Sequence, residues 1–163
     1  MIENELTDRL GVKLPIIQAP MASATTPEMV IAAARAGALG SLGAAYMSPE
    51  DMVVAIRKIR SQIEVPFQVN LFSPSPQRTI TTESFSAANG VLQEIRRDLG
   101  LENLNEFPRY ENNFDEQFDV LIQEKVPIVG FHFGLPNGGY IERAKSADAF
   151  VIGCATRPGD AVK

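Results

Sequence analysis

The sequence has 163 residues, of which 45% are hydrophobic and 21% charged, a composition typical of a soluble globular protein and not of a disordered one. The net charge is −5 and the basic residues are scattered, which argues against a nucleic-acid or anionic-membrane partner. The single cysteine, Cys154, excludes an internal disulfide framework and a cysteine-built metal site, so no metal is expected. The amino terminus has no apolar core and no apolar run approaches the roughly 20 residues of a membrane span, so we expect a cytoplasmic protein.

Strand and helix signals alternate along the first part of the chain. Three short apolar segments indicate strands, at residues 14–20, 38–44 and 67–72. Two helices are predicted between them, each opened by a hydroxyl N-cap, a proline and an acid, with the caps at Thr26 and Ser48. The helix starts lie about 22 residues apart, which is the spacing of successive βα units.

Residues 73–113 interrupt this alternation. The stretch is polar and rich in turn signals, and a helix is predicted in it from the apolar positions Val91, Leu92, Ile95 and Leu99. We expect an insertion within one domain spanning residues 1–163. Such an insertion covers a pocket, packs on a neighbour or has no function of its own, and the sequence leaves these alternatives open.

The alternation resumes at Asn113, which is predicted to cap a helix. A buried strand then leads to His132, a short helix follows at 141–145, and a fifth strand is predicted at 149–156. Five strands joined by helical crossovers predict an α/β protein with a parallel sheet. A TIM-type (β/α)₈ barrel typically needs about 250 residues, so we expect an incomplete barrel with about five of its eight strands.

The only histidine, His132, lies where the fourth predicted strand ends, just before Gly134 and Pro136. Parallel α/β folds place their chemistry at the ends where strands exit. An imidazole is neutral at about pH 7 and still accepts a proton, so His132 is a candidate catalytic base. The alternative is a hydrogen-bonded core or loop histidine.

Four segments of the chain resemble the nitronate monooxygenase family, also known as 2-nitropropane dioxygenases. They are residues 15–22, 37–43, 66–72 and 130–136, and together they extend the resemblance over essentially the whole chain. The resemblance implies the amino-terminal part of an FMN-dependent (β/α)₈ barrel. Enzymes of this family oxidise alkyl nitronates or nitroalkanes with molecular oxygen.

The resemblance also implies roles for particular residues. His132 is expected to act as the base or to steady the nitro oxygens. The implied cofactor-binding residues are Ala19, Pro20, Met21, Ala22, Asn70 and Thr156. Asn70 would meet the pyrimidine edge of the flavin, although a bond to a neighbouring loop is the alternative. Residues 19–22 would lie along the ring, although a simple strand-ending turn is also compatible with them.

The chain departs from the family pattern in one respect. The family holds the FMN phosphate with glycine-rich loops after later strands, and this sequence contains no such loops. We therefore expect weak FMN binding by this chain alone, and a homo-oligomer that buries its open sheet edges. A fragment of a longer protein and a chain completed by a partner both remain open. The alternative functions are a flavin-dependent enoyl-acyl-carrier-protein reductase and a truncated non-catalytic remnant that folds by association.

Overall fold

The structure, a computed structural model, describes residues 4–74, 81–102, 104 and 113–161. The chain divides into two compact units. The main unit combines Met1–Pro74 with Asn113–Lys163, and the insertion unit is Ser75–Asn112. The insertion unit falls inside the segment 73–113, in which the sequence predicts an insertion.

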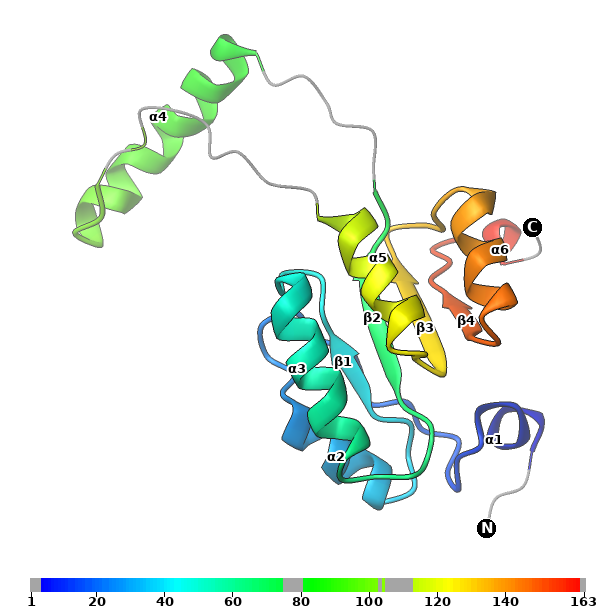
Figure 1. The fold of residues 1–163 in the computed structure, drawn as a ribbon. Helices are drawn as coiled ribbons and strands as arrows, with labels where there is room; N and C mark the ends of the chain where they lie inside the picture. The colour runs from blue at the N-terminus through cyan, green and yellow to red at the C-terminus, as the bar shows by residue number, and fades with distance from the viewer. Residues whose placement is uncertain (1–3, 75–80, 103, 105–112, 162–163) are drawn as a thin grey trace. The chain divides into compact units, whose positions relative to one another are not determined.

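The main unit is built on a four-stranded parallel sheet whose strands lie in chain order (Figure 1). They are β1 (Ser41–Gly43), β2 (Gln68–Phe72), β3 (Ile128–His132) and β4 (Phe150–Gly153). All three pairings, β1 with β2, β2 with β3 and β3 with β4, are parallel. The predicted α/β class with a parallel sheet is therefore confirmed.

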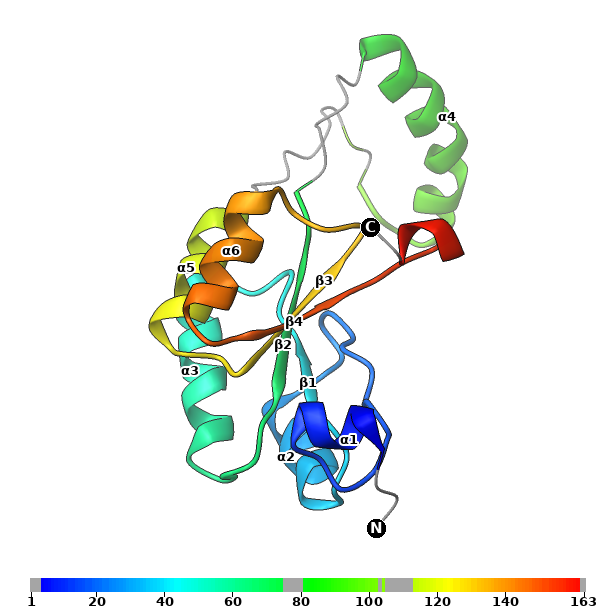
Figure 2. The same ribbon diagram turned by 90° about the vertical axis from the view of Figure 1, so that its right-hand side faces the viewer.

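Five helices of the main unit precede or connect these strands. They are α1 (Glu5–Leu10), α2 (Pro27–Arg35), α3 (Pro49–Arg60), α5 (Phe114–Gln123) and α6 (Gly138–Ser146), and a short 3₁₀ turn, Pro158–Asp160, follows β4. Helices α3, α5 and α6 lie along one side of the sheet (Figure 2). Helix α6 begins at Gly138, before the start predicted for it at residue 141.

The predicted caps of α2 and α3 are confirmed, and that of α5 is not. Thr26 Oγ1 accepts a hydrogen bond from the Met29 amide at 3.3 Å, and Ser48 Oγ accepts one from the Asp51 amide at 3.1 Å. Asn113 precedes α5, but its side chain makes no capping hydrogen bond. Its backbone φ of −91° and ψ of 19° depart from the extended geometry of an ordinary N-cap.

Successive side chains of each strand point to opposite sides of the sheet. One side is apolar and packs against the helices; it carries Leu42, Val69, Leu71, Val129 and Phe131, all buried. The intervening positions lie on the opposite side, and we call six of them, Ser41, Gly43, Gln68, Asn70, Gly130 and His132, the inner face. The apolar residues Phe72, Ile128, Phe150 and Ile152 also lie on this side of the sheet. The inner face is polar or bare of side chains at these positions, although the strands themselves are largely buried.

Helix α1 covers the end of the sheet where the strands begin (Figure 2). Its Leu10 packs in a buried cluster with Leu39 and Ile128. The sequence analysis missed this helix, although Asn4 and Thr7 form a capping box that marks its start. The two ends of the sheet therefore differ, because buried apolar side chains fill the end where the strands begin.

The predicted strand at 14–20 is reduced to a bridge between Ile17 and Leu39. Its backbone makes three hydrogen bonds to the chain before β1, Leu14 N to Gly37 O, Gln18 N to Leu39 O and Leu39 N to Ile16 O, each at 2.9 Å. The Gln18 side chain then replaces the backbone, since its Oε1 accepts from Ser41 N at 2.9 Å and its Nε2 donates to Ser41 O at 3.2 Å. Hydrogen bonds from the Gln18 side chain therefore take the place of backbone pairing beside Ser41, and the segment does not form a regular fifth strand.

Among its described residues, the insertion unit forms one helix, α4 (Thr82–Asp98). Thr81 Oγ1 caps it by accepting from Ser84 N at 3.1 Å. None of its residues is buried, and the predicted apolar stripe is present but exposed, with Val91 at 73% and Leu99 just beyond the helix at 68%. Within the described ranges, no helix combines the length and the apolar character needed to cross a membrane.

We predict that Gln18→Leu lowers the free energy of unfolding by about 1–3 kcal/mol, because it leaves the buried amide and carbonyl of Ser41 unpaired. A urea titration followed by circular dichroism measures this change. Gln62→Leu is the matched control, since this amide is exposed and a surface change costs about 0.5 kcal/mol or less. Equal unfolding midpoints for the two variants would show that Gln18 does not support the sheet.

Candidate functional site

The candidate site lies on the inner face, toward the ends where β2 and β3 exit. The register pairs Asn70 with Gly130 and Phe72 with His132. Asn70 is therefore in the middle of β2. His132 is the last residue of β3, as expected.

His132 and Asn70 are in direct contact. Nδ1 of the half-buried His132 lies 2.8 Å from Oδ1 of Asn70, and Asn70 is only 2% exposed. The other amide atom of Asn70, Nδ2, donates to the Leu71 carbonyl at 3.2 Å. The two residues that the family resemblance singles out on β2 and β3 are thus joined by a hydrogen bond.

Ser73 fixes the backbone around the histidine, and the sequence analysis did not identify it. Its amide donates to the His132 carbonyl at 2.9 Å, and its hydroxyl donates to the Gly134 carbonyl at 2.7 Å. The turn that follows His132 has left-handed geometry, with φ of 64° at Phe133 and 100° at Gly134. Phe133 is 73% exposed, and its ring lies edge-on to that of Phe72 at 4.8 Å between centroids.

The loop Ala19–Pro20–Met21–Ala22 lies against the exit of β1. Thr25 holds it, because Met21 N donates to Thr25 Oγ1 at 2.8 Å and Thr25 N donates to Met21 O at 2.9 Å. A Cβ added at Gly43 would lie 2.6 Å from the Met21 carbonyl carbon and 2.7 Å from the Ala22 nitrogen. Since Gly43 pairs with Asn70 in the sheet, this loop borders the same face as the Asn70–His132 pair.

Two further side-chain amides, those of Gln18 and Gln68, lie near this group. Gln18 is bonded to the backbone of Ser41, whose hydroxyl donates to Gln68 Oε1 at 3.1 Å. A Cβ at Gly130 would lie 1.9 Å from Gln68 Nε2 and 2.7 Å from Asn70 Oδ1. The sequence analysis assigned no role to Gln18, Ser41 or Gln68. The available signal was the alternation of Gln68 and Asn70 with apolar residues along one strand.

Thr156 is not brought into this group. The sequence predicts that the fifth strand ends at Thr156, whereas β4 ends at Gly153 and Thr156 lies in an exposed bend beyond it. No hydrogen bond between described residues joins its side chain to His132, Asn70 or the loop 19–22.

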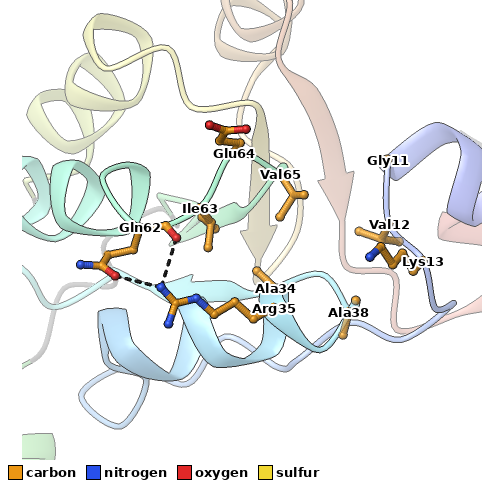
Figure 3. Close-up of a pocket in the computed structure, with 11 residues that line it drawn as sticks. Gly11, Val12, Lys13, Ala34, Arg35, Ala38, Gln62, Ile63, Glu64 and Val65 are labelled. Carbon is orange, nitrogen blue, oxygen red and sulfur yellow. Dashed lines mark hydrogen bonds between the residues drawn. The ribbon is translucent and has the colours of Figure 1, made fainter.

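A pocket of about 260 Å³ opens at the other end of the sheet (Figure 3). It is lined by the chain segments that lead into β1 and β2, with Lys13, Arg35 and Glu64 as its charged residues. Arg35 Nη2 donates to Gln62 Oε1 at 2.9 Å and to its backbone carbonyl at 3.3 Å. No predicted site residue lines this pocket, and chemistry in barrels of this type lies at the opposite end of the strands. We therefore place the candidate site on the inner face.

Comparison with known proteins agrees with the resemblance of the four segments. A sequence profile described as "Nitronate monooxygenase" matches residues 3–161. The chain belongs to the nitronate monooxygenase family. Probable nitronate monooxygenases of Staphylococcus aureus (strain JH9) and Staphylococcus haemolyticus (strain JCSC1435) are both 37% identical, each with 98% of this chain covered. The matched regions make up 45% and 44% of those proteins, so the chain spans less than half the length of these curated relatives.

Solved structures show the same partial coverage. Nitroalkane oxidase from Streptomyces ansochromogenes superposes with a TM-score of 0.85 at 32% identity, over 97% of this chain and 44% of that one. FabK from Thermotoga maritima gives a TM-score of 0.71 at 28% identity, over 99% and 40%. The predicted class, an incomplete TIM-type barrel, agrees with this coverage of barrel enzymes.

We predict that Gly43→Ala lowers the free energy of unfolding by about 1–3 kcal/mol, because the added methyl meets the backbone of the loop 19–22. Urea titration of the variant measures the loss. Gly138→Ala is the matched control, since nothing lies within 4 Å of a Cβ at this first residue of α6 and alanine favours a helix. A Gly43 variant as stable as the control would show that the loop does not lie against β1.

Proposed function

We propose that this chain provides the strand-exit face of a flavin-dependent oxidoreductase that oxidises nitroalkanes or their nitronates with molecular oxygen. The observation that carries the proposal is the contact between the buried Asn70 and the half-buried His132 on the inner face of a sheet with this family's fold. The nitroalkane oxidase neighbour, at 32% identity, supports the same substrate class.

The family is flavin-dependent, and FMN is the cofactor we propose. The residues present fit one side of a flat ring. Ala19 and Ala22 are small, Gly43 and Gly130 add no side chain to the inner face, and Asn70 supplies a buried amide. We propose that Ala19, Pro20, Met21, Ala22 and Asn70 meet the ring, with Thr156 as a weaker candidate. When bound, the flavin would take electrons from the substrate and pass them to oxygen.

His132 would act on the substrate through its second ring nitrogen. Nδ1 is engaged with Asn70, so Nε2 is the atom left to accept a proton. The proton comes from the carbon that bears the nitro group, and the electron pair left behind is delocalised onto the nitro oxygens as the nitronate. A positioned base of this kind typically contributes about 10²–10⁴-fold to the rate.

A second enzyme class has some support from the FabK neighbours, which share the fold at 28% identity. A flavin-dependent enoyl-acyl-carrier-protein reductase would oxidise NADH in the presence of an enoyl thioester, and a nitronate-oxidising enzyme would not depend on that thioester. A non-catalytic remnant would show neither activity.

We predict that His132→Asn, in the flavin-loaded protein, lowers turnover of a neutral nitroalkane by about 10²–10⁴-fold and leaves turnover of the preformed nitronate much less affected. The reason is that only the neutral substrate must lose a proton. Oxygen consumption with the two substrates measures the difference, and the flavin spectrum controls for cofactor loading. Equal slowing of both substrates would indicate stabilisation of the nitro group's charge, and no slowing of either would remove His132 from catalysis.

We also propose that this chain self-associates. Strand β4 pairs only with β3 within the described sheet, and the segment 14–18 beyond β1 is likewise an open edge. Phe133 and Leu135 are exposed at 73% and 60% near the exit end. Open parallel edges and exposed apolar side chains favour association. Sedimentation velocity should show a dimer or larger species, and a compact monomer at all concentrations would contradict the proposal.

A further inference from the structure

Both polar atoms of the Asn70 amide make hydrogen bonds, and these bonds indicate which ring nitrogen of His132 carries a proton. The side chain is 2% exposed. One end lies 3.2 Å from the carbonyl oxygen of Leu71, and the other lies 2.8 Å from Nδ1 of His132. A carbonyl oxygen only accepts hydrogen bonds. The amide atom that faces Leu71 must therefore be the nitrogen, and the atom that faces His132 must be the oxygen.

This orientation of the amide decides which nitrogen of the imidazole carries the proton. Asn70 Oδ1 only accepts, so Nδ1 of His132 has to be the donor in the 2.8 Å contact. In a neutral imidazole one nitrogen carries hydrogen and the other carries a lone pair. Nε2 is then the unprotonated nitrogen, and no described residue forms a hydrogen bond with it.

We propose that Asn70 is a positioning residue that holds His132 in the Nδ1–H tautomer and leaves Nε2 as the proton acceptor. The tautomer assignment stands on the hydrogen bonds alone, and only its catalytic consequence rests on the proposed function. This role is additional to the flavin contact proposed for Asn70, because His132 and Leu71 use only one lone pair of Oδ1 and one hydrogen of Nδ2.

The surroundings hold the pair in a single arrangement. Gly130 faces Asn70 across the sheet, and a Cβ there would lie 2.7 Å from Asn70 Oδ1. The Ser73 amide donates to the carbonyl of His132 at 2.9 Å. The imidazole is thus fixed through its own backbone and through its Nδ1, and Nε2 keeps a constant direction on the inner face.

The chain contains one histidine, so its tautomer is measurable directly without assignment of other rings. Protein labelled with ¹⁵N at histidine is observed by a long-range ¹H–¹⁵N correlation at a pH well above the ordinary range of imidazole protonation. The expected spectrum has Nδ1 at the shift of a protonated ring nitrogen and Nε2 at that of an unprotonated one. The experiment needs neither flavin nor substrate.

Three variants test the assignment. Asn70→Ala should move the ratio of Nδ1–H to Nε2–H toward Nε2–H by roughly 2–10-fold, the value of one hydrogen bond. Asn70→Asp keeps an acceptor in the same place and should retain Nδ1–H. Gln117→Ala is the control, because it removes a buried amide on α5 that bonds to the Ala44, Ala45 and Met47 carbonyls and should leave the ratio unchanged. A wild-type ring with Nε2–H, or a ratio unaffected by Asn70→Ala, overturns the proposal.

Turnover measurements test the catalytic role of Asn70 separately from the tautomer. In the flavin-loaded protein, Asn70→Ala should lower kcat for a neutral nitroalkane more than for the preformed nitronate, with Asn70→Asp recovering part of the loss. Absence of any nitroalkane oxidation by the unaltered protein would contradict the proposed function and leave the tautomer result standing. A large loss on both substrates together with an unchanged tautomer would instead indicate that Asn70 serves the cofactor.

Discussion

The exit end of the sheet depends on one constraint, which is that every buried amide on the inner face must find hydrogen-bond partners. An unpaired buried donor or acceptor costs about 1–3 kcal/mol. Gln68 is paired with the Ser41 hydroxyl, and Asn70 with His132 and Leu71. The half-buried Gln18, beside this face, is paired with the backbone of Ser41. Because these partners come from several segments of the main unit, the pairing also sets how the segments lie against one another.

Bare backbone at two positions of the inner face makes this arrangement possible. Gly130 lets the amides of Gln68 and Asn70 occupy the space above β3, and Gly43 lets the loop 19–22 approach the exit of β1. Both glycines have ordinary backbone geometry, so the reason for glycine here is close approach and not a left-handed φ. Small residues thus create the room in which the polar groups and the loop meet.

The same fold carries different chemistries in its structural neighbours, which include a nitroalkane oxidase and FabK. A fold is therefore weak evidence for a reaction, and the argument for this chain depends on the site. The imidazole on β3, held by an amide on β2, is the part of that site that bears on proton removal. The pocket at the other end of the sheet lacks these groups.

The sequence by itself determined the order of the four strands and of helices α2 to α6, the caps at Thr26 and Ser48, and the place of His132 at the end of its strand. These features depend on local periodicity and capping, which neighbouring residues specify. The sequence did not predict α1, and it predicted a regular strand at 14–20 where the structure has a bridge. The tertiary structure decided that Gln18 replaces a strand, that Ser73 fixes the turn after His132, and that Asn70 bonds to His132. It also decided that Thr156 lies beyond the end of β4, apart from the other predicted site residues. Each of these contacts depends on the register between segments far apart in the chain, and no local pattern contains that register.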